Sequence, residues 1–152
     1  MSVRIDISPP IKDKSTLDPM RVLVVEDNAV NQVVAMRMLQ RLGCQTDVAA
    51  DGQKAIDMIK ASFYDLVFMD CQMPVLDGYE ATAQIRRDEV PGAHLPIVAM
   101  TANAIQGDRE RCLEAGMDDY VSKPVNKDEI IAILKRYLPA PSSHQEESVA
   151  TT

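Results

Sequence analysis

The stretch VFMDCQMPVLDG (residues 67–78) decides the fold of this chain. Its first residues belong to an apolar run, LVFM, that is typical of a strand buried on both faces, and Asp70 follows that run directly. A loop containing Pro74 and Gly78 then leads into a helical pattern. Strand, polar strand end, loop and helix in this order form the repeating unit of a parallel α/β sheet.

The same unit occurs five times along the chain. Strand patterns lie at 21–25, 46–50, 65–69, 95–100 and 119–122, and helical patterns follow them at 29–42, after Gly52, at 79–88, 106–115 and 127–138. Five units in roughly 120 residues predict a doubly wound α/β fold, a five-stranded parallel sheet with five helices, because a barrel needs eight units and about 250 residues. Neither the dinucleotide-binding pattern GxGxxG nor a P-loop is present.

The first helical pattern carries a marked apolar stripe. Its residues are Val30, Val34, Met38 and Leu42, flanked by Val33 and Leu39. This spacing predicts an amphipathic helix, with Asn28 available as its N-cap and Gly43 as its end.

Both ends of the chain differ from the part between them. Residues 1–20 are interrupted by Pro9-Pro10 and Pro19, and we interpret them as a leader or linker. Residues 139–152 offer almost nothing to bury, which predicts a disordered tail. The folded unit is therefore expected to be 21–138.

Composition excludes several classes of protein. The net charge of −7 argues against direct nucleic-acid binding, since such domains usually carry a basic face. No apolar run is long enough to span a bilayer and no signal peptide is visible, so we expect a cytoplasmic protein with no membrane contact by this segment. Cys44, Cys71 and Cys112 form no CxxC pair and are interpreted as reduced thiols, with Cys71 a small buried thiol rather than a redox sensor.

Polar residues stand at the ends of four of the predicted strands. Glu26 and Asp27 follow the first, Asp70 the third, Thr101 the fourth and Lys123 the fifth. The carboxyl ends of parallel strands share one edge, where ligands bind, so these groups should meet. Carboxylate oxygens favour Mg²⁺, and a lysine and a hydroxyl suit a phosphoryl group.

Each of these residues also has a structural interpretation when it is considered alone. The acidic pair can be a helix N-cap with an acidic first turn, and Asp70 can form an Asx turn. Lys123 can be a solvated surface lysine and Thr101 an ordinary β-branched strand residue. Their joint placement favours the functional interpretation.

Asp70 is the group in this set that can act as a nucleophile, because a carboxylate can attack phosphorus to give an aspartyl phosphate. Mg²⁺ and Lys123 would neutralise charge in the transition state. His94 lies before the fourth strand and His144 in the tail, so neither is expected at the site. We therefore expect a protein that receives a phosphoryl group and has no external substrate, and do not class it as an enzyme.

The motifs VLVVEDN, MDCQMPVLDG, AMTA and YVSKP, in this order, resemble the receiver domain of two-component response regulators over 21–138. The resemblance implies a flavodoxin-like receiver fold with Asp70 as the phosphoacceptor. It implies that Mg²⁺ is bound by Asp27, Asp70 and the main-chain carbonyl of Gln72, with Glu26 acting mainly through water. The phosphoryl donor would be a histidine kinase or a histidine phosphotransfer domain.

The resemblance also implies a conformational switch. Thr101 and Lys123 would bind the phosphoryl group, and Tyr120 would turn inward when Thr101 engages it. The surface around the fourth and fifth strand–helix units would then change and bind the partner. The Lys123–Pro124 peptide bond would be cis, and Ala102 would leave access to the acyl phosphate.

A finer resemblance concerns the kind of receiver. The segments CQMPVLDGYEATAQIR and AMTANAIQGDRERCLEAGMDDYVSKP look like receivers of hybrid sensor histidine kinases. Residues 1–20 would then be an interdomain linker, and the chain the cytoplasmic part of a kinase that can be membrane-anchored.

Three alternatives remain open from the sequence. The first is a small Mg²⁺-dependent phosphatase with an aspartate nucleophile, although the second catalytic aspartate expected two residues after the first is Gln72 here. The second is a pseudo-receiver, an interaction module that no longer takes phosphate. The third is a structural ion-pair cluster.

Overall fold

A computed structural model of the chain describes residues 20–73, 76–102 and 108–137. Strands and helices alternate along it as predicted. The strands are β1 (Arg21–Val25), β2 (Gln45–Ala49), β3 (Leu66–Asp70), β4 (Ile97–Thr101) and β5 (Asp119–Ser122), and the helices are α1 (Ala29–Arg41), α2 (Gly52–Ala61), α3 (Gly78–Asp88), α4 (Asp108–Ala115) and α5 (Lys127–Tyr137). The predicted tail and all but Met20 of the predicted linker lie outside the described residues.

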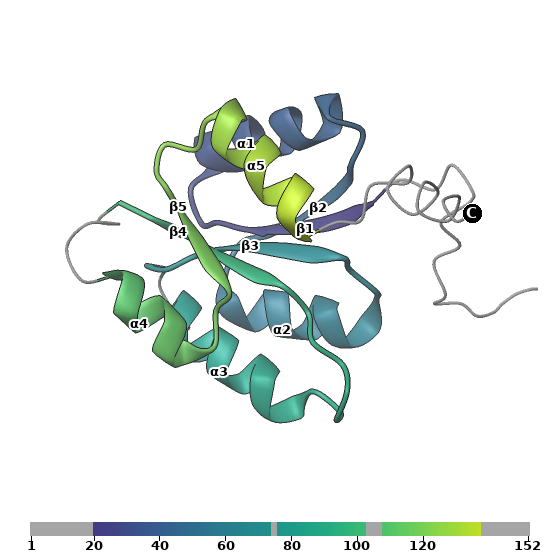
Figure 1. The fold of residues 1–152 in the computed structure, drawn as a ribbon, viewed down its shortest axis with the longest axis vertical. Helices are drawn as coiled ribbons and strands as arrows, with labels where there is room; N and C mark the ends of the chain where they lie inside the picture. The colour runs from purple at the N-terminus through teal and green to yellow at the C-terminus, as the bar shows by residue number, and fades with distance from the viewer. Residues whose placement is uncertain (1–19, 74–75, 103–107, 138–152) are drawn as a thin grey trace, which may run out of the picture.

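The strands form one parallel sheet in the order β2-β1-β3-β4-β5. In Figure 1, α1 and α5 cover one face of this sheet, and α2, α3 and α4 cover the other. This confirms the doubly wound, flavodoxin-like fold. Chain order reverses between β1 and β3, and the carboxyl edge at such a point is where open α/β sheets bind ligands.

Side chains of each central strand alternate between two hydrophobic cores. Val22 and Val24 of β1 pack with α1 and α5, whereas Leu23 and Val25 pack with α2, α3 and α4. All four valine and leucine side chains are fully buried. Burial on both faces explains why the central strands read as continuous apolar runs instead of alternating patterns.

The predicted apolar stripe of α1 is confirmed only in its second half, where Leu39 is buried and Met38 and Leu42 are partly buried against the core. The residues that α1 buries are Ala35 and Leu39, whereas Val30 is 69% exposed and Val34 is 39% exposed. A stripe repeating strictly every four residues drifts around a helix of 3.6 residues per turn, so packing selects one part of it. Asn28 does cap the helix, because its side chain accepts a hydrogen bond from the backbone N–H of Asn31.

Two strand boundaries also differ from the predictions in a way that concerns the site. β3 and β4 extend to Asp70 and Thr101, which are the last residues of their strands instead of the first residues after them. Asp70 pairs in register with Met100, and Thr101 with Ser122. At the other end of β4, the backbone N–H of Leu95 bonds to the carboxylate of Glu89, so that residue is not part of the strand.

None of the described helices has the length and hydropathy of a membrane span.

Candidate functional site

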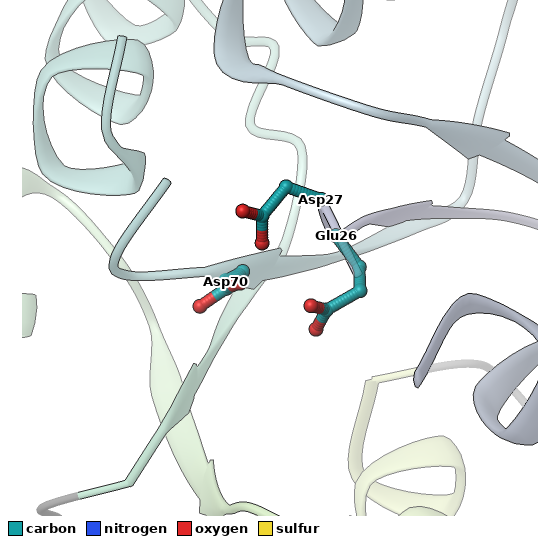
Figure 2. Close-up of side chains that lie close together, drawn as sticks. All are labelled: Glu26, Asp27 and Asp70. Carbon is teal, nitrogen blue, oxygen red and sulfur yellow. The ribbon is translucent and has the colours of Figure 1, made fainter. Parts of the chain in front are cut away.

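Three carboxylates gather at the carboxyl edge of the sheet, at the switch point between β1 and β3. Figure 2 shows Glu26 and Asp27 projecting from the end of β1 toward Asp70 at the end of β3. Each residue offers an oxygen atom, and these oxygens all lie within 4.8 Å of one another. Glu26 and Asp70 are buried, and Asp27 is exposed.

Asp70 has a different environment at each of its two carboxylate oxygens. Oδ1 lies 3.1 Å from the Nζ atom of Lys123 and accepts a hydrogen bond from the backbone N–H of Gln72 at 3.1 Å. Oδ2 is buried and has no hydrogen-bond partner among the described residues. An unpartnered buried carboxylate oxygen is costly, which indicates that this position is shaped for a ligand.

Burial raises the pKa of Asp70 to about 6, and the negative charge of Glu26 adds to this rise. The Gln72 N–H and the Lys123 ammonium act in the opposite direction and do not overcome it. The site thus holds more negative charge than its own lysine compensates, and it should favour an added cation.

Glu26 is held by the start of α1. Its Oε2 atom accepts hydrogen bonds from the backbone N–H of Asn28 at 3.2 Å and from the Nδ2 atom of Asn31 at 3.4 Å. Its backbone carbonyl accepts a hydrogen bond from the side chain of Gln32 at 2.7 Å. The sequence analysis missed Asn31 and Gln32, although two amides in the first turn after an acidic strand end were a usable signal.

Lys123 connects the carboxylates to the β4–β5 side of the site. Its Nζ atom lies 3.5 Å from Oε1 of Glu26, and its backbone N–H donates to the carbonyl of Thr101 at 2.9 Å. Burial works against the charged form, but hydrogen bonds and charge from Asp70 and Glu26 prevail and raise the pKa of Lys123. The Lys123–Pro124 peptide bond is cis, which confirms that expectation.

The other predicted site residues lie around this centre. Thr101 is buried at the end of β4, and Gln72 and Ala102 are exposed in the loops that follow β3 and β4. Tyr120 is half-buried on β5, where the guanidinium of Arg109 from α4 lies 5.9 Å from its ring centroid. Tyr120 is therefore not part of the carboxylate cluster itself.

Gly78 is a further residue of the site that sequence reasoning did not single out as functional. A Cβ atom at this position would lie 2.2 Å from the carbonyl oxygen of Asp70 and 2.9 Å from the Cγ atom of Met69. The start of α3 can approach the end of β3 this closely because residue 78 has no side chain.

This arrangement suits a hard divalent cation. Carboxylate oxygens are ligands that such cations prefer, and the cluster can hold a metal ion on one side of Asp70. Lys123, on the other side, supplies a positive charge for an anionic group. A nucleophilic carboxylate between a cation and an ammonium is the arrangement that phosphoryl transfer to Asp70 would require.

Comparison with known proteins gives one consistent family. The model of the response regulator receiver domain matches residues 22–135. The chain is 46% identical over 118 residues to hybrid signal transduction histidine kinase I of Dictyostelium discoideum. That match covers 74% of this chain and 7% of the relative, so the chain spans a small part of that protein's length.

Solved structures agree with this match. The receiver domain of a sensor histidine kinase from Pseudomonas aeruginosa PAO1, which has a magnesium ion coordinated in its active site cleft, is 49% identical with a TM-score of 0.73. That match covers 79% of this chain and 98% of the other. The receiver domain of Ssk1 from Saccharomyces cerevisiae, crystallised with the histidine phosphotransfer protein Ypd1, is 34% identical with a TM-score of 0.72, covering 78% of this chain and 88% of the other.

Proposed function

This chain belongs to the response regulator receiver family, and on that premise we propose that it accepts a phosphoryl group from a partner phosphohistidine onto Asp70. The observation that carries the proposal is the buried Oδ2 atom of Asp70, which has no hydrogen-bond partner among the described residues. Because Oδ1 is occupied by Lys123 and Gln72, Oδ2 is the oxygen available to attack phosphorus. The product is an acyl phosphate, and the histidine nitrogen of the donor is the leaving group.

Mg²⁺ is the proposed cofactor. Asp27, Asp70 and the main-chain carbonyl of Gln72 would hold it, with Glu26 acting through water. Bound there, Mg²⁺ would offset negative charge on the phosphoryl oxygens. The exposure of Asp27 beside two buried carboxylates supports this assignment, because the cluster opens to solvent on the side of Asp27.

Lys123 and Thr101 would bind the phosphoryl group. Lys123 reaches Asp70 directly, and its backbone hydrogen bond to Thr101 couples the ends of β4 and β5. Tyr120 lies on β5 three residues before Lys123. We assign Thr101 and Tyr120 to a switch in which engagement of the phosphoryl group shifts the population of Tyr120 toward the interior.

The donor would be a histidine kinase or a histidine phosphotransfer protein. The similarity to a hybrid histidine kinase supports an origin of this chain within such a kinase. The chain would then belong to the cytoplasmic part of that kinase. In this role the domain would promote its own phosphorylation and slow hydrolysis without turning over an external substrate.

Intact mass spectrometry of the full chain tests the proposal. The chain is incubated with phosphoramidate as a small phosphodonor, with and without Mg²⁺, and we expect a gain of one phosphoryl group that requires the metal. Asp70→Asn should abolish the gain. Asp57→Asn, which changes an exposed aspartate of α2, is the matched control and should behave like the unchanged chain.

The same assay separates the alternatives. A gain that persists in Asp70→Asn would overturn the assignment of the phosphoacceptor. No gain from either phosphoramidate or a phosphorylated histidine phosphotransfer protein, in a sample that binds Mg²⁺ by calorimetry, would identify a pseudo-receiver.

A further inference from the structure

Two cysteines that are far apart in the sequence meet beside the site. The Sγ atoms of Cys71 and Cys112 lie 3.8 Å apart, and both residues are buried. Cys71 directly follows Asp70, and Cys112 belongs to α4. The pair therefore joins the end of the strand that carries Asp70 to a helix on the face that α2, α3 and α4 cover (Figure 1).

Cys112 has a special place in α4. Among the described side chains of this helix, residues 109–115, Cys112 alone is buried. The exposed side chains of Arg109 and Arg111 lie over the rings of Tyr120 and Tyr79. Cys112 is thus the buried contact of this helix with the core, and its thiol contacts Cys71. On the other side of the contact, Cys71 is fixed by backbone hydrogen bonds from its N–H to Met100 and from Gly78 to its carbonyl.

We propose that Cys71 and Cys112 form a reversible disulfide when the protein meets a peroxide. This revises the interpretation of Cys71 from the sequence as a small buried thiol without a redox role, because the sequence did not show that Cys112 lies beside it. The thiolate of one cysteine attacks a peroxide oxygen, which gives a sulfenic acid and releases hydroxide. The second thiol attacks the sulfenic sulfur, so an S–S bond forms and its proton leaves with the sulfenic hydroxyl as water. The proton that the first thiol lost on forming the thiolate neutralises the hydroxide. Two thiols are oxidised, and hydrogen peroxide is reduced to two water molecules.

The geometry allows this step with limited movement. A disulfide needs its sulfurs at about 2.05 Å, so the two atoms must approach from 3.8 Å. Side-chain rotation and a small shift of α4 can supply the approach, because residues 109–115 have one buried side chain and their ring contacts come from the exposed Arg109 and Arg111. The same weak anchoring favours local opening, which gives a peroxide access to the buried thiols.

Cys44 provides an internal contrast. It is buried at the amino end of β2 in the other hydrophobic core, on the α1 and α5 face of the sheet. Cys71 and Cys112 both lie in the core on the opposite face of the sheet, so neither thiol is placed beside Cys44 to form a disulfide with it. We therefore expect Cys44 to stay reduced under conditions that oxidise the pair.

The consequence of the disulfide is mechanical. The bond would tie α4 to the residue after Asp70 and close a loop between two residues 41 positions apart. The helix could then no longer open independently of β3. Peroxide and a phosphoryl group would thus act on the same strand end, one through Cys71 and the other through Asp70, although the disulfide itself does not depend on phosphorylation.

The test treats the full chain with hydrogen peroxide under native conditions, blocks remaining thiols by alkylation in denaturant, and maps the disulfide by peptide mass spectrometry. We expect a loss of two hydrogen atoms, a Cys71–Cys112 linkage, one alkylated cysteine at position 44, and full reversal by dithiothreitol. Hydrogen exchange of residues 109–115 should slow by at least about tenfold in the oxidised form.

Variants make the result specific. Cys44→Ser should still form the linkage, whereas Cys71→Ser and Cys112→Ser should not. The mapping on the unchanged chain stands even if one of these variants folds poorly. A linkage that involves Cys44, sulfinic acid without a linkage, or a disulfide that forms only in denatured protein would overturn the proposal.

Discussion

The carboxyl and amino edges of the sheet differ in how completely their charged side chains are paired. At the carboxyl edge, three carboxylates lie together, Lys123 pairs with two of them, and Asp70 keeps a buried oxygen with no hydrogen-bond partner among the described residues. At the amino edge, Arg86 from the last turn of α3 joins two carboxylates, Glu89 at 2.7 Å and Asp118 at 2.9 Å. The carboxyl edge thus leaves one buried carboxylate oxygen unpaired, whereas at the amino edge both carboxylates bond to Arg86.

The cluster at the amino edge is also complete in its hydrogen bonds to the backbone. Arg86 donates to the carbonyls of Gly116 and Leu95, each at 2.8 Å. The Oδ2 atom of Asp118 also accepts from the backbone N–H of Ile97, at 2.8 Å. These contacts connect the end of α3 to the starts of β4 and β5. The cluster therefore has a structural role.

This difference gives a criterion for distinguishing a structural cluster of charged side chains from a functional one. Burial alone does not do so, because both edges have buried or half-buried ionisable groups. The completeness of hydrogen bonding separates them. A cluster in which every donor and acceptor has a partner stabilises the fold, whereas a cluster that leaves an acceptor without a partner is available for a ligand. The two edges should therefore respond oppositely to the loss of a charge.

The largest change in stability is expected at the amino edge, where the charged groups are paired. Arg86→Leu would leave Glu89 and Asp118 without their cation, and we expect the free energy of unfolding to fall by about 3 kcal/mol. Urea denaturation at neutral pH measures this. Arg87→Leu, at the exposed next position of the same helix, is the matched control and should change stability by less than about 0.5 kcal/mol. Equal effects of the two variants would remove the contrast between the edges.

The second effect tests the close approach of α3 to the candidate site. Gly78→Ala places a Cβ 2.2 Å from the carbonyl oxygen of Asp70, and the forced displacement should cost about 2 to 3 kcal/mol of stability and weaken Mg²⁺ binding. Gly43→Ala is the control, since Gly43 has a φ of +92° and nothing within 4 Å of its added Cβ. That control should lose stability through backbone strain alone and keep its Mg²⁺ affinity in calorimetry.

The third effect has the opposite sign. Asp70→Asn removes a carboxylate whose pKa burial raises from 3.8 to about 6, so without metal the variant should be more stable than the unchanged chain by about 2 kcal/mol at pH 8. The folded state binds the proton more tightly than the unfolded state, so the unchanged chain loses stability as pH rises from about 4 to about 6.

The pH dependence makes this third prediction specific. Below about pH 4 the carboxyl group is protonated in both states, and the advantage of Asp70→Asn should disappear. Thermal unfolding at several pH values in the presence of a chelator measures the trend. An Asn variant that is less stable at pH 8 would mean that the pair with Lys123 outweighs the buried negative charge.

The smallest change in stability is expected for the exposed member of the cluster around Arg86 and Asp118. His94 lies 2.6 Å from Asp118, but its side chain is 56% exposed, so this pair is screened by solvent. His94→Gln should change the free energy of unfolding by less than about 0.5 kcal/mol in urea titrations. A loss as large as that of Arg86→Leu would show that the cluster depends on its exposed member as much as on its half-buried one.

Local patterns in the sequence were sufficient for the fold and for the location of the candidate site. Apolar runs and helical spacings identified all ten elements. A parallel strand that is buried on both faces has consecutive apolar residues, and a helix that packs on the sheet has apolar residues at helical spacing. Glu26, Asp70 and Lys123 could be placed together from their positions along the chain, since parallel strands bring their carboxyl ends to one edge. The roles of these residues in chemistry stay predictions.

Other features depended on contacts that no local pattern records. Which side of α1 is buried was decided by its packing on β1 and β2, and the apolar spacing alone included Val30 and Val34, which are exposed. The end of β3 at Asp70 was decided by pairing with β4.

The sequence by itself determined the alternation of strands and helices and the polar residues at the strand ends. Both can be read from the pattern of apolar residues along the chain, which marks each strand and helix and the point where each strand ends. The tertiary structure alone decided which charges are matched and which thiols touch. Arg86 meets Asp118 across 32 positions, and Cys71 meets Cys112 across 41. Such contacts are set by the packing of whole elements against one another, and this packing depends on every side chain between them.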